Sequence, residues 1–363
     1  MLSNNTKYYL RPFGFIPQKD LDLQNNKVIE VRGNHYSNIE LIQKEKRRVS
    51  RTNYLVEDFY KLADNNKYLQ KYLNSLKNKK ILSNRILKKK KSLIFSILNV
   101  TPDSFSDGGE NLNFKNNVAK AEQMIKDGAD FIDIGGESTR PGASKVKASD
   151  EILRVLPTIQ SLNHKKINMS LDTRNSSTME LGILAGVKII NDVSALKNDK
   201  KSIDILKKYK IPVILMHMPG TPRTMMKNTN YFDVVLDVYD FLEERIKFCE
   251  SKGIDRNNII IDPGIGFGKK LDDNIKLLKQ LSIFHTLDCP IMLGISRKRF
   301  ISSINKNSDP KDRLGGTIST TIHAMMQGIK IHRVHDVKEA RQAIDVFEKI
   351  NEKWKKNILV PME

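Results

Sequence analysis

Short apolar segments alternate with longer amphipathic segments along the chain from Ser92 onward. The apolar segments are rich in Ile, Leu and Val, which is typical of strands buried on both faces of a parallel sheet. We expect strands at 93–98, 129–134, 167–171, 188–190, 212–216, 259–261, 290–293 and 329–332. Helices are expected between and after them, at 114–127, 149–162, 177–185, 201–208, 232–251, 274–281, 313–326 and 337–352.

Eight β-α units in about 260 residues have the size of a closed (β/α)8 barrel. We therefore predict an α/β protein with a TIM barrel over residues 92–352 and a C-terminal tail over 353–363. A doubly wound open sheet is the structural alternative. The even spacing and the count of eight favour the barrel.

The first 91 residues follow a different pattern. Residues 1–50 hold scattered apolar pieces between polar stretches, and no core can be assembled from them. Residues 54–76 carry Tyr, Phe and Leu at nearly helical spacing, so one or two amphipathic helices are expected. Lysine dominates 77–91, which is typical of a solvated linker, with a patch for nucleic acid or an acidic partner as the alternative. The prediction is a basic, partly helical extension over residues 1–91.

The net charge of +20 first suggests a nucleic-acid-binding protein. Residues 1–91 contain 21 Lys and Arg against 8 Asp and Glu, a balance of +13, which leaves +7 for the rest of the chain. Because the barrel region is nearly balanced, nucleic acid is not the expected partner.

Membrane and secreted classes are also not expected. No apolar run approaches the roughly 18 residues of a membrane span, and the first residues lack the apolar core of a secretory signal. Cys249 and Cys289 lie in different predicted elements without metal-ligand spacing. We expect both to be reduced packing residues in a cytoplasmic protein.

Polar residues of both signs follow the predicted strands, where the active site of a barrel lies. They are Asn99, Glu137 to Arg140, Asp172 to Arg174, Asn191, Asp192, His217, Asp262, Ser296 to Lys298, and Arg333 to His335. Any single Asp, Asn or Ser here could be a helix N-cap. Capping does not call for Lys298, Arg333 or His335, so a polar basin is the better explanation.

The loop after the strand at 259–261 is rich in glycine but fits neither the dinucleotide nor the P-loop pattern. We expect it to let the backbone and Phe267 approach a flat ligand, with Phe267 as plain core filler an equal alternative. His217 has no second ligand at metal spacing, so a packing or hydrogen-bonding role is expected.

Eight motifs occur in order between Ser92 and Ile350: NVTPDSFSDGG, DIGGESTRPGA, SLDT, INDVSA, MHMPGTPRTM, DPGIGFGK, GISRKRF and RVHDV. They resemble the motifs of dihydropteroate synthases. The resemblance implies a transferase of folate biosynthesis, a sulfonamide target, which joins 6-hydroxymethyl-7,8-dihydropterin pyrophosphate to para-aminobenzoate and releases pyrophosphate. It also implies a homodimer formed through the late helices.

The resemblance implies roles for individual residues. The pterin would be bound by Asp172, Asn191, Met216, Asp262, Phe267 and Lys298. Asp262 is a suitable partner for the amino-pyrimidine edge, since one carboxylate can accept two parallel N–H bonds. Asn99, Arg333 and His335 would form the site from which Mg²⁺ and pyrophosphate leave. Asp172, Lys298, Arg333 and His335 would be catalytic, through a dissociative mechanism in which Asp172 stabilises the pterin cation.

Two loops would close over the site and exclude water, 101–109 and 138–142, the second carrying Thr139 and Arg140. Ser296 and Arg297 would line the arylamine pocket.

Two other functions remain open from the sequence. One is a methyltetrahydrofolate-corrinoid methyltransferase, which reads the same pterin edge but does not need the pyrophosphate group at Asn99, Arg333 and His335. The other is an inactive barrel with a nucleic-acid-binding arm. The extension itself could be a remnant of a fused pterin pyrophosphokinase, a cap on the bottom of the barrel, or a dimerisation element.

Overall fold

The computed structural model of the chain describes residues 6–18, 20–21, 27–77, 92–100, 110–306 and 309–352, without the side chains of 110–113. The predicted lysine-rich run from residue 78 onward, the loop 101–109 and the tail 353–363 lie outside these residues.

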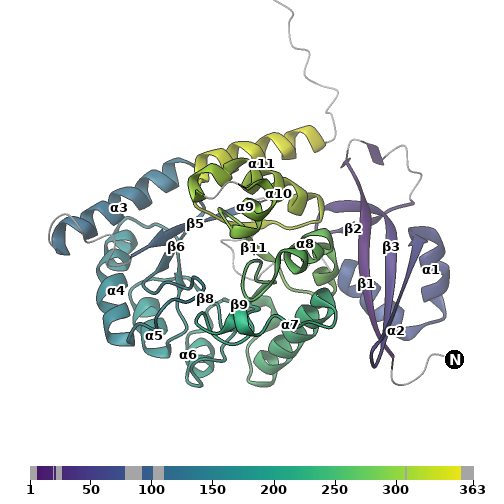
Figure 1. Cartoon of the computed structure of the whole chain (residues 1–363), viewed down its shortest axis with the longest axis horizontal. Coiled ribbons are helices and arrows are strands. Elements are labelled where there is room, and N and C mark those ends of the chain that lie inside the picture. The colour runs from purple at the N-terminus through teal and green to yellow at the C-terminus, as the bar shows by residue number, and fades with distance from the viewer. Residues whose placement is uncertain are drawn as a thin grey trace, which may run out of the picture.

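Within the described residues, eight parallel strands form the centre of the molecule (Figure 1). They are β5 (Leu93–Asn99), β6 (Phe131–Gly135), β7 (Met169–Asp172), β8 (Ile189–Asp192), β9 (Val213–Met216), β10 (Ile259–Asp262), β11 (Met292–Gly294) and β12 (Ile331–Val334). Their order is β10-β9-β8-β7-β6-β5-β12-β11, and a parallel bridge between Ile261 and Ile291 brings the two ends of the sheet together. The predicted barrel is confirmed, and the open sheet is not formed.

Helices surround the strands, as expected for a parallel sheet whose outer face must be covered. They are α3 (Glu110–Lys126), α4 (Ala148–His164), α5 (Ser176–Leu184), α6 (Ser202–Tyr209), α7 (Val234–Ser251), α8 (Leu271–Lys279), α9 (Arg299–Asn305), α10 (Leu314–Met326) and α11 (Val337–Asn351). Short 3-10 helices are η3 (Met225–Lys227), η4 (Arg256–Asn258), η5 (Leu281–Leu287) and η6 (Pro310–Arg313). The sequence pattern did not predict η5 or α9 as separate elements.

Side chains that point into the barrel form an apolar layer across its interior. The layer consists of Leu93, Phe95, Phe131, Ile189, Ile214, Ile260, Met292 and Ile331. Phe95 and Phe131 stack with their ring centroids 4.6 Å apart. Because side chains alternate along a strand, the inward residue two positions later stands one layer higher, at the mouth of the barrel.

Residues 6–77 form a second sheet with two helices beside the barrel (Figure 1). Its strands are β1 (Thr6–Ile16), β2 (Ile29–Val31), β3 (Asn34–Glu45) and β4 (Arg48–Leu55), and β3 pairs antiparallel with the other three. The helices are α1 (Val56–Asp64) and α2 (Lys67–Lys77). The helices agree with the prediction. The expectation that residues 1–50 build no core is wrong, since they are mostly strand.

The two faces of this sheet are buried against different partners. Leu10 and Leu41 are cross-strand neighbours in a cluster with Phe59 of α1 and Leu73 of α2. Tyr9, on the opposite face, belongs to the main core of the barrel. The sheet is therefore a layer between its own helices and the barrel, although most of β4 is exposed.

Charged pairs join the sheet to the barrel around α7. Lys7 and Lys44 donate to Asp240 at 2.6 and 2.9 Å, and Tyr9 donates to the same carboxylate at 2.8 Å. Ser282 of η5 donates to the carbonyl of Pro12 at 2.6 Å. Proline has no N–H to donate to a neighbouring strand, so it is found at the edges of sheets, and β1 is such an edge strand. The same proline interrupts the strand pattern in the sequence.

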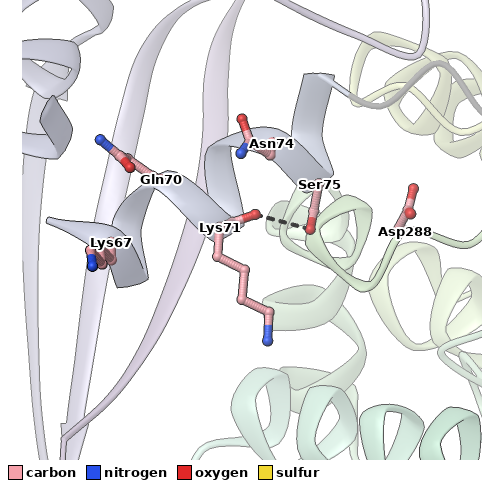
Figure 2. A pocket seen from close by; sticks show the side chains of 6 residues that line it. All are labelled: Lys67, Gln70, Lys71, Asn74, Ser75 and Asp288. Carbon is pink, nitrogen blue, oxygen red and sulfur yellow. Dashed lines mark hydrogen bonds between the residues drawn. The ribbon is translucent and has the colours of Figure 1, made fainter.

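A shallow polar pocket of about 420 Å³ marks the junction between α2 and the barrel (Figure 2). It is lined by Lys67, Gln70, Lys71, Asn74, Ser75 and Asp288. Asp288 precedes β11, so the pocket opens near the amino ends of the strands and not at their carboxyl ends.

Among the described helices, none is both long and apolar enough to span a membrane.

Replacing Tyr9 by Ala removes a buried ring that packs edge-on against Tyr239, with ring centroids 5.0 Å apart. We expect the free energy of unfolding to fall by about 3 kcal/mol in urea denaturation. Tyr68→Ala is the matched control, since Tyr68 is 65% exposed on α2, and it should change stability by less than about 0.5 kcal/mol. Equal effects of the two substitutions would show that the Tyr9 contact does not hold the sheet to the barrel.

Candidate active site

The carboxyl ends of the eight strands gather polar side chains directly above the apolar layer. The inward positions two residues beyond that layer include Asp133, Asn191, Met216, Asp262, Gly294 and Arg333. All of them are buried except Arg333, whose side chain is 20% exposed. The strand alternation thus places a polar layer on an apolar floor.

Arg333 connects two buried carboxylates at the centre of this layer. Its Nε donates to Asp133 at 2.5 Å, and its Nη2 donates to Asp172 at 2.9 Å. Asp133 also accepts hydrogen bonds from Ser170 at 2.6 Å and from Asn191 at 3.1 Å. Although burial opposes the charged form, the two carboxylates raise the pKa of Arg333. The guanidinium is therefore permanently charged, with further N–H donors for an anion.

Asp172 lies between Arg333 and several other acids. Burial raises its pKa to about 8; Arg333 acts in the opposite direction, and the nearby Asp133 raises it further. Its Oδ1 is buried and has no hydrogen-bond partner among the described residues. A buried carboxylate with an unused oxygen is suited to accept a donor or a positive charge from a ligand.

Asp262 stands at the end of β10, with only 3% of its surface exposed. Its Oδ1 accepts the backbone N–H of Gly264 at 2.7 Å, which fixes the carboxylate and leaves Oδ2 beside the backbone of Gly294. Burial raises the pKa of Asp262, and Lys298 opposes that shift.

Lys298 lies close enough to this carboxylate for each group to shift the pKa of the other. Burial lowers the pKa of Lys298 to about 8, against the effect of Asp262. Its Nζ donates to the carbonyl of Ile265 and lies 4.6 Å from the ring centroid of Phe267. Phe267 packs against a cluster that includes Met216. The loop after β10 therefore places an aromatic ring against an apolar cluster and beside a cation. The flat ligand expected there stays a prediction.

Ser296 and His335 form a second corner of the mouth. The backbone N–H of His335 donates to Ser296 Oγ at 3.2 Å, and His335 Nδ1 lies 3.0 Å from the same oxygen. Burial, followed by Arg333 and Arg297, lowers the pKa of His335 to about 4, so the imidazole is neutral at pH 7. When the Ser296 hydroxyl donates to Nδ1, the ring proton is on Nε2 and is free to face a ligand.

Three predicted site residues lie further out. Arg297 forms an ion pair with Asp336, with Nε 3.0 Å from Oδ2. Thr139 is half-buried and Arg140 exposed, on the loop after β6. That loop is tied to the loop after β9 by a hydrogen bond from the Gly142 N–H to the carbonyl of Pro222 at 3.1 Å. Arg140 contributes to the lowered pKa of His335, so its charge acts at the same corner.

Asn99 is exposed at the carboxyl end of β5. A Cβ built on Gly135 would lie 3.8 Å from Asn99 Oδ1 and 3.9 Å from Asp172 Oδ2, so the two oxygens flank the same glycine. Mg²⁺ keeps several waters and takes few protein oxygens when a phosphate also binds it. Asn99 offers one such oxygen, while Asp172 Oδ2 already accepts from Arg333. No cluster of three His, Cys, Asp or Glu residues that could hold a metal occurs in the described parts of the chain.

Asp133 was not singled out from the sequence, although it begins the motif DIGGESTRPGA. Its signal was an acid inside an otherwise apolar strand, which is rare unless the acid is paired.

Lys269, at the end of DPGIGFGK, was also missed, and it is 4% exposed. His217 is a hydrogen-bonding histidine as expected, with Nδ1 2.9 Å from Lys269 Nζ. Cys249 and Cys289 are free and buried, as expected.

Comparison with known proteins agrees with this geometry. Residues 95–335 match the family of pterin binding enzymes. A dihydropteroate synthase of Escherichia coli K12 is 41% identical over 256 residues, covering 70% of this chain and 90% of the relative. One of Bacillus subtilis is 42% identical over 257 residues, covering 70% and 87%. The chain belongs to the dihydropteroate synthase family.

Solved structures of the family share the fold. Dihydropteroate synthase of Xanthomonas albilineans with 4-aminobenzoic acid has a TM-score of 0.67 and 40% identity, covering 71% of this chain and 93% of that chain. The Yersinia pestis enzyme in a sulfonamide drug complex has a TM-score of 0.67 and 38% identity, covering 71% and 94%. The chain is thus a dihydropteroate-forming transferase of folate biosynthesis, and the corrinoid methyltransferase alternative is not supported.

Asp133→Asn tests the buried charge cluster. The amide keeps the shape but turns an N–H₂ group toward donors on Ser170, Asn191 or Arg333, so we expect a loss of about 3 kcal/mol in the free energy of unfolding. The synthase kcat/KM should fall at least about tenfold, because Arg333 loses an anchor. Asp127→Asn, at a carboxylate whose partner is Gln123 on the exposed end of α3, should leave both quantities near wild type. If Asp133→Asn matched that control, the cluster would not organise the site.

Proposed function

We propose that the barrel mouth performs the synthase reaction by a dissociative mechanism, with the pterin between Asp262 and Asp172. The observation that carries this proposal is the polar layer itself. It has a fixed acid at β10 on one side, and on the other a charged arginine that pairs with two acids. A cationic pterin carbon and a pyrophosphate need those opposite fields at neighbouring positions.

The pterin is held by its polar edge and by its faces. Asp262 accepts two N–H bonds from the amino-pyrimidine edge, and Asn191 adds a further polar contact. Lys298 donates to the ring carbonyl in place of its present bond to Ile265. Phe267 and Met216 contact the ring faces from one apolar cluster. The fixed Asp262 oxygen makes this site selective for a ring with paired donors.

The leaving group departs beside Arg333 and His335. The bond between the pterin methylene carbon and the pyrophosphate oxygen breaks with its electron pair on oxygen. Arg333 donates to the phosphate, and neutral His335 donates its Nε2 proton in a hydrogen bond. Asp172 faces the methylene carbon and stabilises the positive charge. Mg²⁺ would be held by Asn99 and the pyrophosphate, where it neutralises the charge of the leaving group.

The arylamine nitrogen completes the reaction by attacking the cation, and its proton passes to the basic pyrophosphate that has been released. We place para-aminobenzoate near Ser296 and Arg297, with Thr139 and Arg140 on the loop above. Water would consume the cation, so the loops at the mouth must cover the site when both substrates are bound. The hydrogen bond between Gly142 and Pro222 joins the loop after β6 to the loop after β9.

The extension has no assigned part in this chemistry. The family match begins at residue 95, and residues 6–77 contact the barrel at α7 and η5. We propose that residues 1–91 are an accessory unit that covers the barrel wall, and that residues 92–352 are the synthase domain. A homodimer through the late helices is supported by exposed apolar residues there, such as Ile304 and Ile350. The two free cysteines support a cytoplasmic location.

Asp262→Asn keeps the hydrogen bond from Gly264 but replaces a charged acceptor by a neutral one. We expect affinity for the pterin pyrophosphate to fall about 30-fold, corresponding to about 2 kcal/mol, when measured by calorimetry. Asp272→Asn, at an exposed residue in the first turn of α8, is the control. Pyrophosphate release on addition of para-aminobenzoate measures the activity of each protein. An unchanged pterin affinity for Asp262→Asn would remove Asp262 from the proposed role.

Asn99→Ala tests the metal site. Because one amide oxygen is lost while the phosphate ligands remain, we expect the Mg²⁺ concentration for half-maximal turnover to rise about tenfold. Treatment with a chelator should abolish turnover of the wild type, with recovery on adding Mg²⁺. Asn163→Ala, at the exposed end of α4, should titrate like wild type. If Asn99→Ala gave the same Mg²⁺ titration as wild type, Asn99 would not be a metal ligand.

A further inference from the structure

Lys269 places a buried amine directly behind the wall of the proposed pterin pocket. Its Nζ lies 2.8 Å from the carbonyl oxygen of Gly264, 3.0 Å from that of Phe267 and 2.9 Å from His217 Nδ1. Burying an amine is costly unless its hydrogen bonds are satisfied. Here these partners surround it, together with the carbonyl oxygen of His217 at 3.4 Å. The amine thus adds a side-chain link between the loop after β10 and His217, the residue that follows β9.

The segment that Lys269 holds is the one that fixes Asp262. Gly264 donates to Asp262 Oδ1 at 2.7 Å and has a φ of +68°. A Cβ at this position would lie 2.0 Å from the carbonyl oxygen of His217. The turn is therefore pressed against the backbone of His217, and Lys269 bonds to the turn and to the His217 ring at once.

Phe267 is held by the same clamp. Its carbonyl accepts from Lys269, while its ring lies below Lys298 Nζ. Lys298 in turn donates to the carbonyl of Ile265. Two lysines thus bond three carbonyls within one four-residue turn, but only Lys298 stands on the pocket side and can exchange its carbonyl for a ligand.

The clamp does not depend on the charge of Lys269. Burial and the nearby Lys298 hold the pKa of Lys269 well below its ordinary value, and burial with Lys269 does the same for His217. An ammonium group donates all three bonds. A neutral amine donates two to the carbonyls and accepts the third from His217 Nδ1–H, so either form keeps the three contacts.

We propose that Lys269 is a positioning residue for pterin binding, which acts through Asp262 and Phe267 without touching the substrate. The inference rests on the proposed role of Asp262. Lys269 keeps the carboxylate and the aromatic wall in the relative positions that one flat ring requires. Its loss therefore weakens pterin binding before and during the reaction alike, and leaves the leaving-group corner around Arg333 intact.

Lys269→Met tests this, because it keeps the length and volume of the side chain and removes the amine. We expect the KM for the pterin pyrophosphate to rise about tenfold while kcat stays within about twofold, the pattern of lost uniform binding. Calorimetry with pterin pyrophosphate alone should show the same loss of affinity. Lys270→Met is the matched control, since it removes the same charge from the next, exposed residue, and it should behave as wild type.

Lys269→Gln provides a second measurement if the Met variant does not fold, because its amide can still donate to one carbonyl. The affinity of Lys269→Gln for the pterin pyrophosphate should lie between that of wild type and that of Lys269→Met. Wild-type pterin affinity in a folded Lys269 variant, or a fall in kcat at unchanged KM, would overturn the inference. A wild-type protein that releases no pyrophosphate would instead overturn the proposed mechanism, so the two failures are distinguishable.

Discussion

The site depends on the Arg333 guanidinium, which allows two carboxylates to be buried side by side in the mouth of the barrel. Asp133 is fully buried and Asp172 nearly so, and two unpaired acids at this depth would strongly destabilise the fold. Arg333 pairs with both. The same arrangement leaves a positive group with spare donors next to an acid whose second oxygen has no partner among the described residues. Such a pair suits a site that separates a cation from an anion.

Strand geometry gives this cluster its surroundings. Each strand points alternate residues inward, so an apolar layer and a polar layer follow one another two residues apart. Phe131 and Asp133 are such a pair on β6, and Ile260 and Asp262 are another on β10. The apolar floor excludes water from below, which strengthens the electrostatic interactions above it. Stability and chemistry are therefore assigned to successive positions of the same short strands.

The N-terminal sheet shows how the surroundings of a segment can hide its pattern. One face packs on α1 and α2 and the other on the barrel, with Lys7 and Lys44 paired to Asp240 of α7. Apolar and charged residues consequently occur on the same buried face. Part of the basic excess that resembled a nucleic-acid signal is used in these pairs, although the lysine-rich run from residue 78 onward lies outside the described residues.

The sequence alone determined the eight alternating units, the limits of nearly all barrel elements and, through its motifs, the family. Local periodicity carries that information because a strand buried on both faces and its covering helix each have their own pattern.

Only the tertiary structure decided which polar residues meet. Asp133 and Arg333 are 200 positions apart, and Lys269 reaches back to His217 across a turn whose shape no local pattern specifies. The burial of the sheet of residues 6–55 likewise depends on its packing partners. Tyr9 belongs to the core only because the barrel covers that face of the sheet. Partners far along the chain set burial and charge pairing, and these long-range contacts are not written in any single stretch of sequence.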